Sequence, residues 1–352
     1  MKIRNIEIDF LSLELADPYT VAYETFDKAD HVFIRLDTGE ISGWGCMAPD
    51  PQVTGEHARL IYPEASEKLP DLLRGSDPLR RAKIMDRIRH EFPNHSSLQA
   101  AVDMALWDIL GKKAGLPVWK ILGGYRSRIE TSVTIGICPV EDTLRYAESH
   151  IDRGFRILKI KGGLAPEDDL ERLVKLRERF GNGIRLRFDA NQGYSYPQAL
   201  WFIGKVQPVN LELLEQPTRQ GEPEHLGLVK HRSTVPVMAD ESLVSLMDAF
   251  RVAKRGLVDL INIKIMKVGG ISEAIQVDSV ARSAKIGVMV GCMDESALGI
   301  SAGLQFALSR KNIRFADLDG HLDLLDDPAY GTVIIKDGQL FPTDSPGLGW
   351  NG

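Results

Sequence analysis

Between residues 184 and 264 the chain repeats one pattern four times, a short apolar run that ends in a charged residue. The runs IRLRFD, LELLE, VPVMAD and LINIK end at Asp189, Glu215, Asp240 and Lys264. Successive ends are 26, 25 and 24 residues apart, which is the length of a strand, a helix and two short loops. This repeat predicts consecutive βα units with parallel strands. In a closed barrel all strand C-termini open onto one face, so these charged side chains are expected to meet there.

The composition narrows the class of protein. Hydrophobic residues make up 43% and charged residues 26%, which is ordinary for a globular chain of 352 residues. The net charge of -6 argues against nucleic acid and anionic membranes as partners. No secretory signal or run of roughly 20 apolar residues is present in the sequence. The three cysteines, Cys46, Cys138 and Cys292, have no metal-like spacing, so we expect free thiols and a cytoplasmic location.

Residues 1 to 120 are predicted to form an α+β capping domain. KIRNIEIDFLSLEL alternates like a strand, and HVFIRLDTGEISGWG reads as a hairpin around DTGE. The stretch between them, residues 17 to 30, is predicted to be a loop whose position suits a lid. Helical patterns occupy residues 55 to 92, and SSLQAAVDMALWDILGKKAG forms a helix that ends at Gly115.

Residues 121 to 324 are predicted to form a (β/α)8-type barrel, the catalytic domain of an α/β protein. ETSVTIGI and FRILKIKGG supply two strands before the four apolar runs, and two further strands are expected to end near residues 291 and 317. The total is eight. Residues 325 to 352 contain a further strand hairpin, TVIIKDGQLF, and are expected to return to the capping domain.

The three carboxylates at successive strand ends predict a metal site. Asp189, Glu215 and Asp240 offer hard oxygen ligands, which suit Mg²⁺. A single charged residue at a strand end would only mark the approach to solvent. Three in register, each within a polar cluster (DANQ, EQP and DES), favour the metal. Asn191 and Glu241 belong to these clusters and are predicted to support the ligands.

Two lysines flank this predicted site. Lys161 ends the second strand and Lys264 the sixth, and a barrel places these strands on opposite sides of its axis. By alternation Lys159 points the same way as Lys161. Because a cationic neighbour and Mg²⁺ lower the pKa of a lysine, we expect Lys161 to be a general base tuned by Lys159. A solvated surface position remains the alternative for Lys159 and Lys267.

The motifs KIKGG, RFDANQGY, LLEQP, ADES and NIKIMKVGG, in this order and spacing, resemble the enolase superfamily in its muconate-lactonising subgroup. The resemblance covers nearly the whole chain. It implies one Mg²⁺ on the three carboxylates, removal of the proton α to a substrate carboxylate, and a metal-stabilised enediolate. A lysine on each face of that planar species permits inversion by 1,1-proton transfer. The subgroup with a strand-seven histidine base is disfavoured, because VMVGCMDES contains no histidine.

The eighth strand narrows the expected reaction. IRFADLDGH places Asp317 and Asp319 two residues apart, hence on one face of the strand end. This resembles the Asp-x-Asp feature of dipeptide epimerases, in which the pair binds the α-ammonium of the first residue while the second is inverted. The expected substrate is therefore an L,L-dipeptide. An ordinary strand-end turn is the alternative.

The pocket for the inverted residue is predicted to be acidic. Glu24, Asp50 and Asp294 are the candidate lining residues, and no cation occurs in their stretches. We therefore expect a preference for basic or polar second residues. Solvated loop acids are the alternative, and Glu295 is an equal candidate to Asp294 for facing the site.

Two other functions are open at this level. A cycloisomerase or lyase of the same scaffold, of the muconate cycloisomerase or o-succinylbenzoate synthase type, shares the enediolate step. An acidic pair at Asp317 and Asp319 would repel such anionic substrates. A catalytically silent binding barrel would leave five converging charges unexplained. A homo-oligomer remains open.

Overall fold

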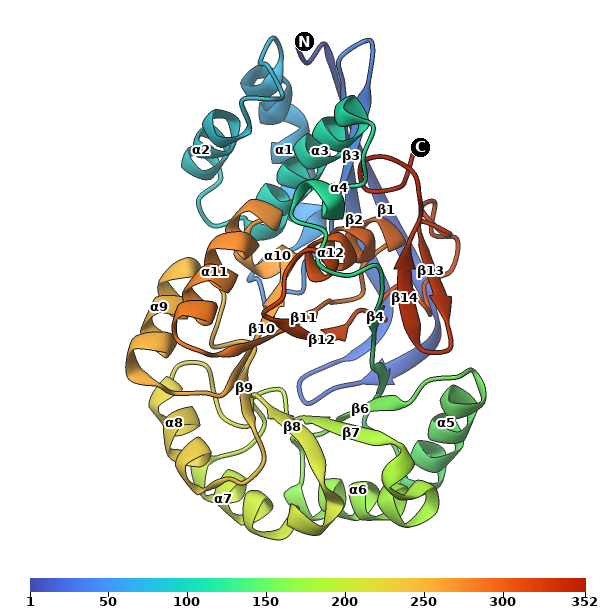
Figure 1. Ribbon diagram of the computed structural model, residues 1–352, viewed down its shortest axis with the longest axis vertical. Helices are drawn as coiled ribbons and strands as arrows, with labels where there is room; N and C mark the ends of the chain where they lie inside the picture. The colour runs from blue at the N-terminus through green and yellow to red at the C-terminus, as the bar shows by residue number, and fades with distance from the viewer.

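The computed structural model describes residues 1–352 and has two lobes (Figure 1). The capping lobe pairs a three-stranded antiparallel sheet with helices on one side of it. Its elements are β1 (Asn5–Thr20), β2 (Thr25–Asp37), β3 (Ser42–Met47), α1 (Ala58–Leu73), α2 (Arg81–Glu91), α3 (Ser96–Ala114) and α4 (Val118–Ile121). Helix α3 ends as predicted at Gly115, whose φ of 67° is in the left-handed region that glycine adopts readily.

The second lobe is the predicted barrel of eight parallel strands, joined in sequence order from β5 to β12. Thr131 pairs with Ala316, and the amide of Ser132 donates to the carbonyl of Ala316 at 3.2 Å, which closes the ring. The strands are β5 (Val133–Ile135), β6 (Ile157–Lys161), β7 (Arg185–Asp189), β8 (Leu211–Glu215), β9 (Val237–Ala239), β10 (Leu260–Lys264), β11 (Gly287–Gly291) and β12 (Ile313–Asp317).

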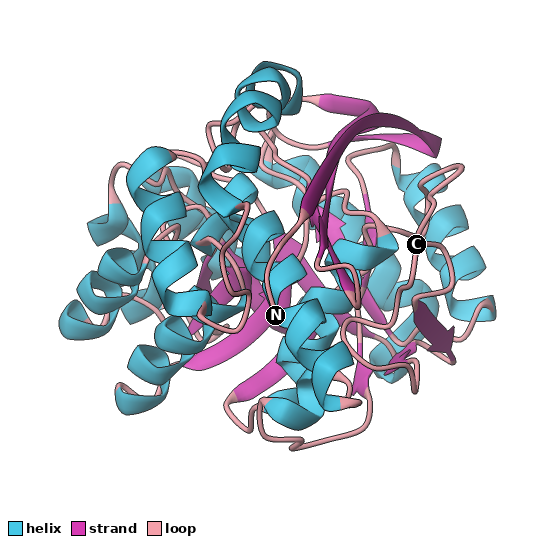
Figure 2. Cartoon of the chain, turned by 90° about the horizontal axis from the view of Figure 1, so that it is seen from above, coloured by secondary structure: helices cyan, strands magenta, loops and turns pink.

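Helices surround the barrel strands, as the view from above shows (Figure 2). Most are amphipathic and bury one face, but every residue of α12 is buried, because this helix contacts both the barrel and the sheet of the capping lobe. The barrel helices are α5 (Val140–Asp152), α6 (Pro166–Phe180), α7 (Tyr196–Lys205), α8 (Pro223–Arg232), α9 (Leu246–Arg255), α10 (Ile265–Val268), α11 (Ile271–Ser283) and α12 (Ala297–Ser309). No helix has the combination of length and apolar character needed to cross a membrane.

The predicted loop at residues 17 to 30 is wrong. Strands β1 and β2 stay paired as far as Thr20 and Thr25, which leaves only a tight turn at residues 21 to 24. Tyr19 and Phe26 are partners across the two strands, with ring centroids 5.5 Å apart. Pro18 interrupts the alternation at a register shift, which explains why the sequence reads as a loop. We call residues 12 to 30 the arm; it reaches down to the barrel (Figure 1, blue).

The chain returns to earlier segments after the barrel. Strands β13 (Val333–Lys336) and β14 (Gln339–Pro342) form the predicted hairpin, and β14 pairs with β4 (Ile129–Glu130). Beyond it, the rings of Trp350 and Trp44 lie 4.6 Å apart, so the tail contacts the capping lobe. The division of the chain into domains after residues 120 and 324 stays a prediction.

Candidate active site

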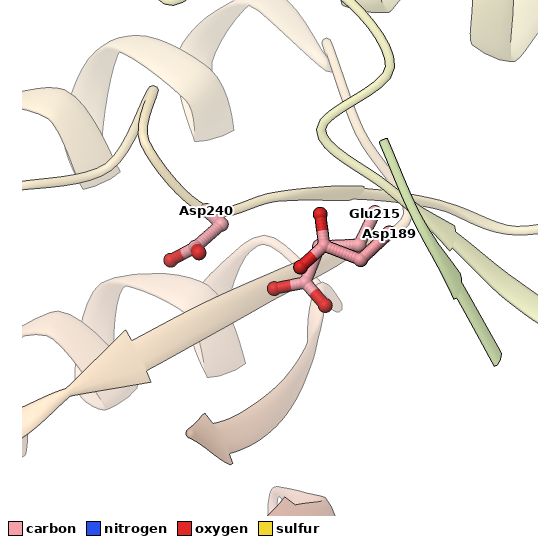
Figure 3. A group of neighbouring side chains, drawn as sticks. All are labelled: Asp189, Glu215 and Asp240. Atoms are coloured by element: carbon pink, nitrogen blue, oxygen red, sulfur yellow. The ribbon is translucent and has the colours of Figure 1, made fainter. Parts of the chain in front are cut away.

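The three predicted carboxylates converge at the C-terminal end of the barrel strands (Figure 3). Asp189 and Glu215 are the last residues of β7 and β8 and pair in register, while Asp240 directly follows β9. One oxygen of each lies within 4.8 Å of the others, and all three side chains are fully buried. The strand-end spacing of the sequence therefore brings the carboxylates together as expected.

Four lysines surround these carboxylates. The Nζ of Lys161 lies 2.9 Å from Asp189, and that of Lys264 lies 2.8 Å from Asp240. The surface alternative is wrong for both other lysines. Lys159, only 2% exposed, lies within 3.1 Å of Asp189 and Glu215. Lys267, 1% exposed, donates to the side chain and, at 2.6 Å, to the carbonyl of Asp240.

The pKa values of the cluster reflect burial opposed by charge pairing. Burial raises the pKa of Asp240, but Lys264 and Lys267 lower it well below its usual range. Burial and then Asp189 raise the pKa of Glu215 to about 7. Burial lowers the pKa of Lys264, but Asp240, Glu215 and Glu241 together raise it, so that the net shift is upward. Because the pKa values of Asp189 and Asp240 are lowered, Glu215 is the carboxylate of the three whose negative charge the lysines neutralise least.

Three buried carboxylate oxygens accept no hydrogen bond, namely Glu215 Oε2, Asp240 Oδ2 and Glu241 Oε2. Lys159 Nζ lies 2.9 Å from Glu215 Oε2, and Lys264 Nζ lies 2.8 Å from Asp240 Oδ2. Neither contact has hydrogen-bond geometry. Buried oxygens without a directional partner, within a set of hard oxygen donors, fit Mg²⁺. Asn191 lies beside the cluster, where its Nδ2 donates to Glu241 Oε1 at 3.2 Å, and its supporting role stays a prediction.

Two adjoining cavities open at this end of the barrel. The first, about 470 Å³, is lined by both Lys161 and Lys264. The second, about 340 Å³, is lined by Lys161, Asp317 and Asp319. Both cavities share Lys161 and a short wall made of Tyr19, Cys292, Met293 and Asp294.

Asp317 and Asp319 differ in their surroundings. Asp317 accepts hydrogen bonds from Ser132 Oγ at 2.6 Å and Lys159 Nζ at 2.8 Å. Burial raises the pKa of Asp317, but Lys159, Ser132 and Arg187 together lower it to about 2. Asp319 accepts only the amide of Thr134 at 2.6 Å and a long contact from a thiol. Burial and then Asp317 raise the pKa of Asp319 to about 6, so Asp319 is the less neutralised carboxylate of the pair.

The predicted pocket acids all line the first cavity. Asp294 accepts from Tyr19 Oη, and Asp50 accepts from Tyr23 Oη at 2.8 Å, while Glu24 is exposed in the turn of the arm. Glu295 turns inward, accepts the amide of Met293 at 3.1 Å and lines neither cavity. Of the two equal candidates, Asp294 is therefore the one that faces the cavities.

The sequence prediction missed the two tyrosines and two further acids of this cavity, Asp30 and Glu56. Tyr19 and Tyr23 lie within the stretch predicted as a loop. Without a strand pattern there, the sequence did not indicate which way their side chains point. The available signal was the pair of aromatic residues four apart beside Glu24.

Comparison with known proteins places the chain in a family. Residues 6–123 match the mandelate racemase/muconate lactonizing enzyme N-terminal domain, and residues 142–351 match the enolase C-terminal domain-like model. The chain belongs to this enolase-superfamily group. The L-Lys-D/L-Arg epimerase of Desulforapulum autotrophicum is 39% identical, with 99% of each chain covered.

Two solved structures of this family have nearly the same fold. The L-Ala-D/L-Glu epimerase of Bacillus subtilis, in a substrate-liganded complex, has a TM-score of 0.96 and 35% identity over 99% of this chain and 98% of that one. The dipeptide epimerase of Methylococcus capsulatus, complexed with Mg and L-Arg-D-Lys, has a TM-score of 0.94 and 36% identity over 99% of both chains. The predicted enolase-superfamily fold is confirmed, including its capping lobe.

Proposed function

We propose that this chain is a Mg²⁺-dependent epimerase that inverts the Cα of the second residue of an L,L-dipeptide. The observation that carries the proposal is the meeting of the two cavities at Lys161. One cavity is lined by two lysines that each contact a carboxylate of the cluster, and the other is lined by an acidic pair. A dipeptide spans such a site, with its reacting Cα in the first cavity and its ammonium in the second.

Asp189, Glu215 and Asp240 would hold the Mg²⁺. When bound, the ion supplies positive charge at the carboxylate on which negative charge develops during proton removal. Lys267 keeps Asp240 oriented through its bonds to both the side chain and the carbonyl. Asn262 does the same for Glu215, to which it donates a hydrogen bond of 2.7 Å.

Lys161 and Lys264 are the proposed acid and base. They come from β6 and β10, the second and sixth strands of the barrel, and both line the first cavity. Removal of the α-proton by one lysine and its return by the other inverts the centre. Asn191 Oδ1, 3.1 Å from Lys161 Nζ, orients that amine. Lys159 contacts Asp189 and Glu215 directly, so its proposed role is to balance their charge.

Asp319 and Asp317 are the proposed ammonium site. Asp317 is already paired with Lys159. Asp319 lines the second cavity, and one of its carboxylate oxygens has only a long contact with the thiol of Cys292. A substrate ammonium beside Asp319 gains a charge-assisted hydrogen bond. Cycloisomerase and lyase substrates that carry no amine would gain nothing from this pair.

A basic second residue is the proposed substrate preference. Asp294, Asp50, Glu24, Asp30 and Glu56 line the first cavity, and its cations other than the two reacting lysines are Lys28 and Arg59. Arg59 is paired with Asp30 at 2.8 Å and thus cancels that acid. Asp294 and Asp50 accept hydrogen bonds from neutral tyrosines, and Asp50 also accepts one from a backbone amide. Neither accepts one from a cation, so both stay available to a lysine or arginine side chain of the substrate.

We propose a cytoplasmic location, which the three free cysteines support. The net charge of -6 supports a small-molecule partner and not nucleic acid. A homo-oligomer stays a prediction.

The deciding experiment incubates the protein with Mg²⁺ and pooled L,L-dipeptides in D₂O and measures mass. Epimerisation exchanges the α-proton, so each substrate gains one deuteron. We expect the gain in dipeptides whose second residue is Lys or Arg. Gain confined to Ala-Glu or hydrophobic pairs would keep the reaction and reject the basic preference. No gain in any dipeptide would reject the epimerase.

A further inference from the structure

The loop between β11 and α12 forms much of the wall that the two cavities share. Cys292, Met293 and Asp294 all line both cavities. The loop follows Gly291, the last residue of β11, and ends at Ser296, the residue that caps α12. Whatever holds Ser296 therefore limits where Asp294 can lie.

A fully buried histidine of the capping lobe contacts this loop end. His31 lies on β2, and its Nε2 accepts the backbone amide of Ser296 at 3.1 Å. Its Nδ1 lies 3.1 Å from the carbonyl of Ala29. An amide can only donate and a carbonyl can only accept, so Nε2 is unprotonated and Nδ1 carries the hydrogen. This arrangement requires the neutral ring.

The groups around His31 are consistent with a neutral ring. Burial lowers the pKa of His31 and outweighs the opposing effects of the Ala29 carbonyl, Asp327 from the C-terminal segment, the Asp294 carbonyl of the loop and Asp30 on β2. Asp327 also accepts Ser296 Oγ at 2.7 Å and the amide of Ala297 at 2.6 Å. The end of the loop is thus fixed from both the capping lobe and the C-terminal segment.

We propose that His31 is a positioning residue for substrate selection: by accepting the amide of Ser296, it holds Asp294 in the wall shared by the two cavities. The inference rests on the proposed dipeptide epimerase function. It links β2 of the capping lobe to a barrel loop through one hydrogen bond. Loss of this bond loosens the loop, which weakens binding of the second residue's side chain and leaves the lysines in place.

The test compares His31→Phe, which keeps a flat ring but cannot accept, with His31→Gln, whose amide can both accept and donate. Val32→Ala is the matched control, because Val32 is a fully buried neighbour on the opposite face of β2. For L-Ala-L-Lys we expect His31→Phe to raise KM about tenfold and to change kcat by less than about twofold. For L-Ala-L-Ala the KM should stay within about twofold of wild type.

The conservative variant and the control separate positioning from general damage. His31→Gln should bring the KM for L-Ala-L-Lys back to within about threefold of wild type. Val32→Ala should leave the ratio of the two KM values unchanged. Equal KM increases for both dipeptides, or the same ratio change in Val32→Ala, would overturn the proposal.

A second readout does not depend on catalysis. Amide hydrogen exchange of the peptide covering residues 291 to 298 should be at least about tenfold faster in His31→Phe than in wild type, and unchanged in Val32→Ala. Wild-type exchange in His31→Phe would overturn the proposed contact. Wild-type protein that epimerises no dipeptide would instead overturn the proposed function, and the exchange result would still decide the contact.

Discussion

The hydroxyl of Tyr19 lies 3.0 and 3.1 Å from the two carboxylate oxygens of Asp294, which joins the arm of the capping lobe to the barrel loop after β11. Both residues line both cavities. The contact therefore separates the space proposed for the second residue from that proposed for the first. Two predictions depend on it.

Asp294→Asn should lower kcat/KM for dipeptides with a basic second residue by roughly 10- to 100-fold, because hydrogen bonds to charged groups contribute about 1.5–3 kcal/mol. Dipeptides with alanine second should be little affected. Steady-state kinetics on L-Ala-L-Lys and L-Ala-L-Ala measures both. Tyr19→Phe, which removes only the hydroxyl, is the control for disturbance of the wall. An equal loss on both substrates would contradict the role given to Asp294.

The pH dependence of substrate binding should follow Asp294, whose pKa is raised to about 7 by burial, with smaller contributions from Asp319 and Asp50. A basic side chain binds the ionised carboxylate. Protonation therefore weakens binding as the pH falls through 7, and KM for L-Ala-L-Lys should be about tenfold higher at pH 6 than at pH 8. KM for L-Ala-L-Ala should rise only about twofold, through Asp319, whose pKa is about 6. A pH-independent ratio of the two KM values would contradict the prediction.

Lys161→Ala and Lys264→Ala should each abolish epimerisation, with a loss of at least about 10²-fold, because each removes one partner of a two-base reaction. The informative result is exchange of the α-proton in one diastereomer but not in the other. In D₂O, the remaining lysine of either variant is expected to exchange the α-proton of one diastereomer only, which proton NMR detects. Normal turnover by either variant would reject the assignment. Lys175→Ala, at an exposed helix position, serves as the control.

Asp319→Asn should lower kcat/KM for free dipeptides by roughly 10- to 100-fold, since the variant keeps an acceptor for the Thr134 amide but loses the charge that faces the ammonium. N-acetylated dipeptides, which carry no ammonium, provide the comparison. The ratio of kcat/KM for free dipeptides to kcat/KM for acetylated dipeptides should therefore be smaller in the variant than in wild type. A preference that stays at the wild-type value would show that Asp319 does not bind the ammonium.

Mg²⁺ should raise the melting temperature, because a ligand that binds only the native state stabilises it by about 2.7 kcal/mol at 100 times its Kd. Glu215→Gln should weaken this response, and Glu148→Gln, at an exposed position, should not. Differential scanning fluorimetry over a Mg²⁺ titration measures the shift without substrate. An equal shift in Glu215→Gln and wild type would place the ion elsewhere.

The barrel and the position of its carboxylates were predictable from the sequence, because buried parallel strands appear as apolar runs and their ends are marked by a change to polar residues. Asp189, Glu215 and Lys264 each end a strand as predicted. The arm was not predictable in this way. Pro18 breaks the alternation there, and pairing to residue 20 depends on contacts across β1 and β2 that a local pattern does not contain.

Roles that depend on long-range contacts were also missed. Sequence alternation put Lys159 at the barrel mouth but did not reveal that it pairs with Asp317, 158 residues away. The contact between His31 and Ser296 spans 265 residues. Such pairs are set by the packing of the two lobes, so only the folded chain reveals them.

The contact between the rings of Trp350 and Trp44 has a consequence for biosynthesis. The ribosome completes the sheet of the capping lobe long before it reaches Trp350, so Trp44 lacks this contact while the whole barrel is being translated. A nascent capping lobe therefore exposes an aromatic surface of the kind that chaperones bind. The aromatic contact that joins the tail to the capping lobe is therefore expected to form only after the barrel has been translated.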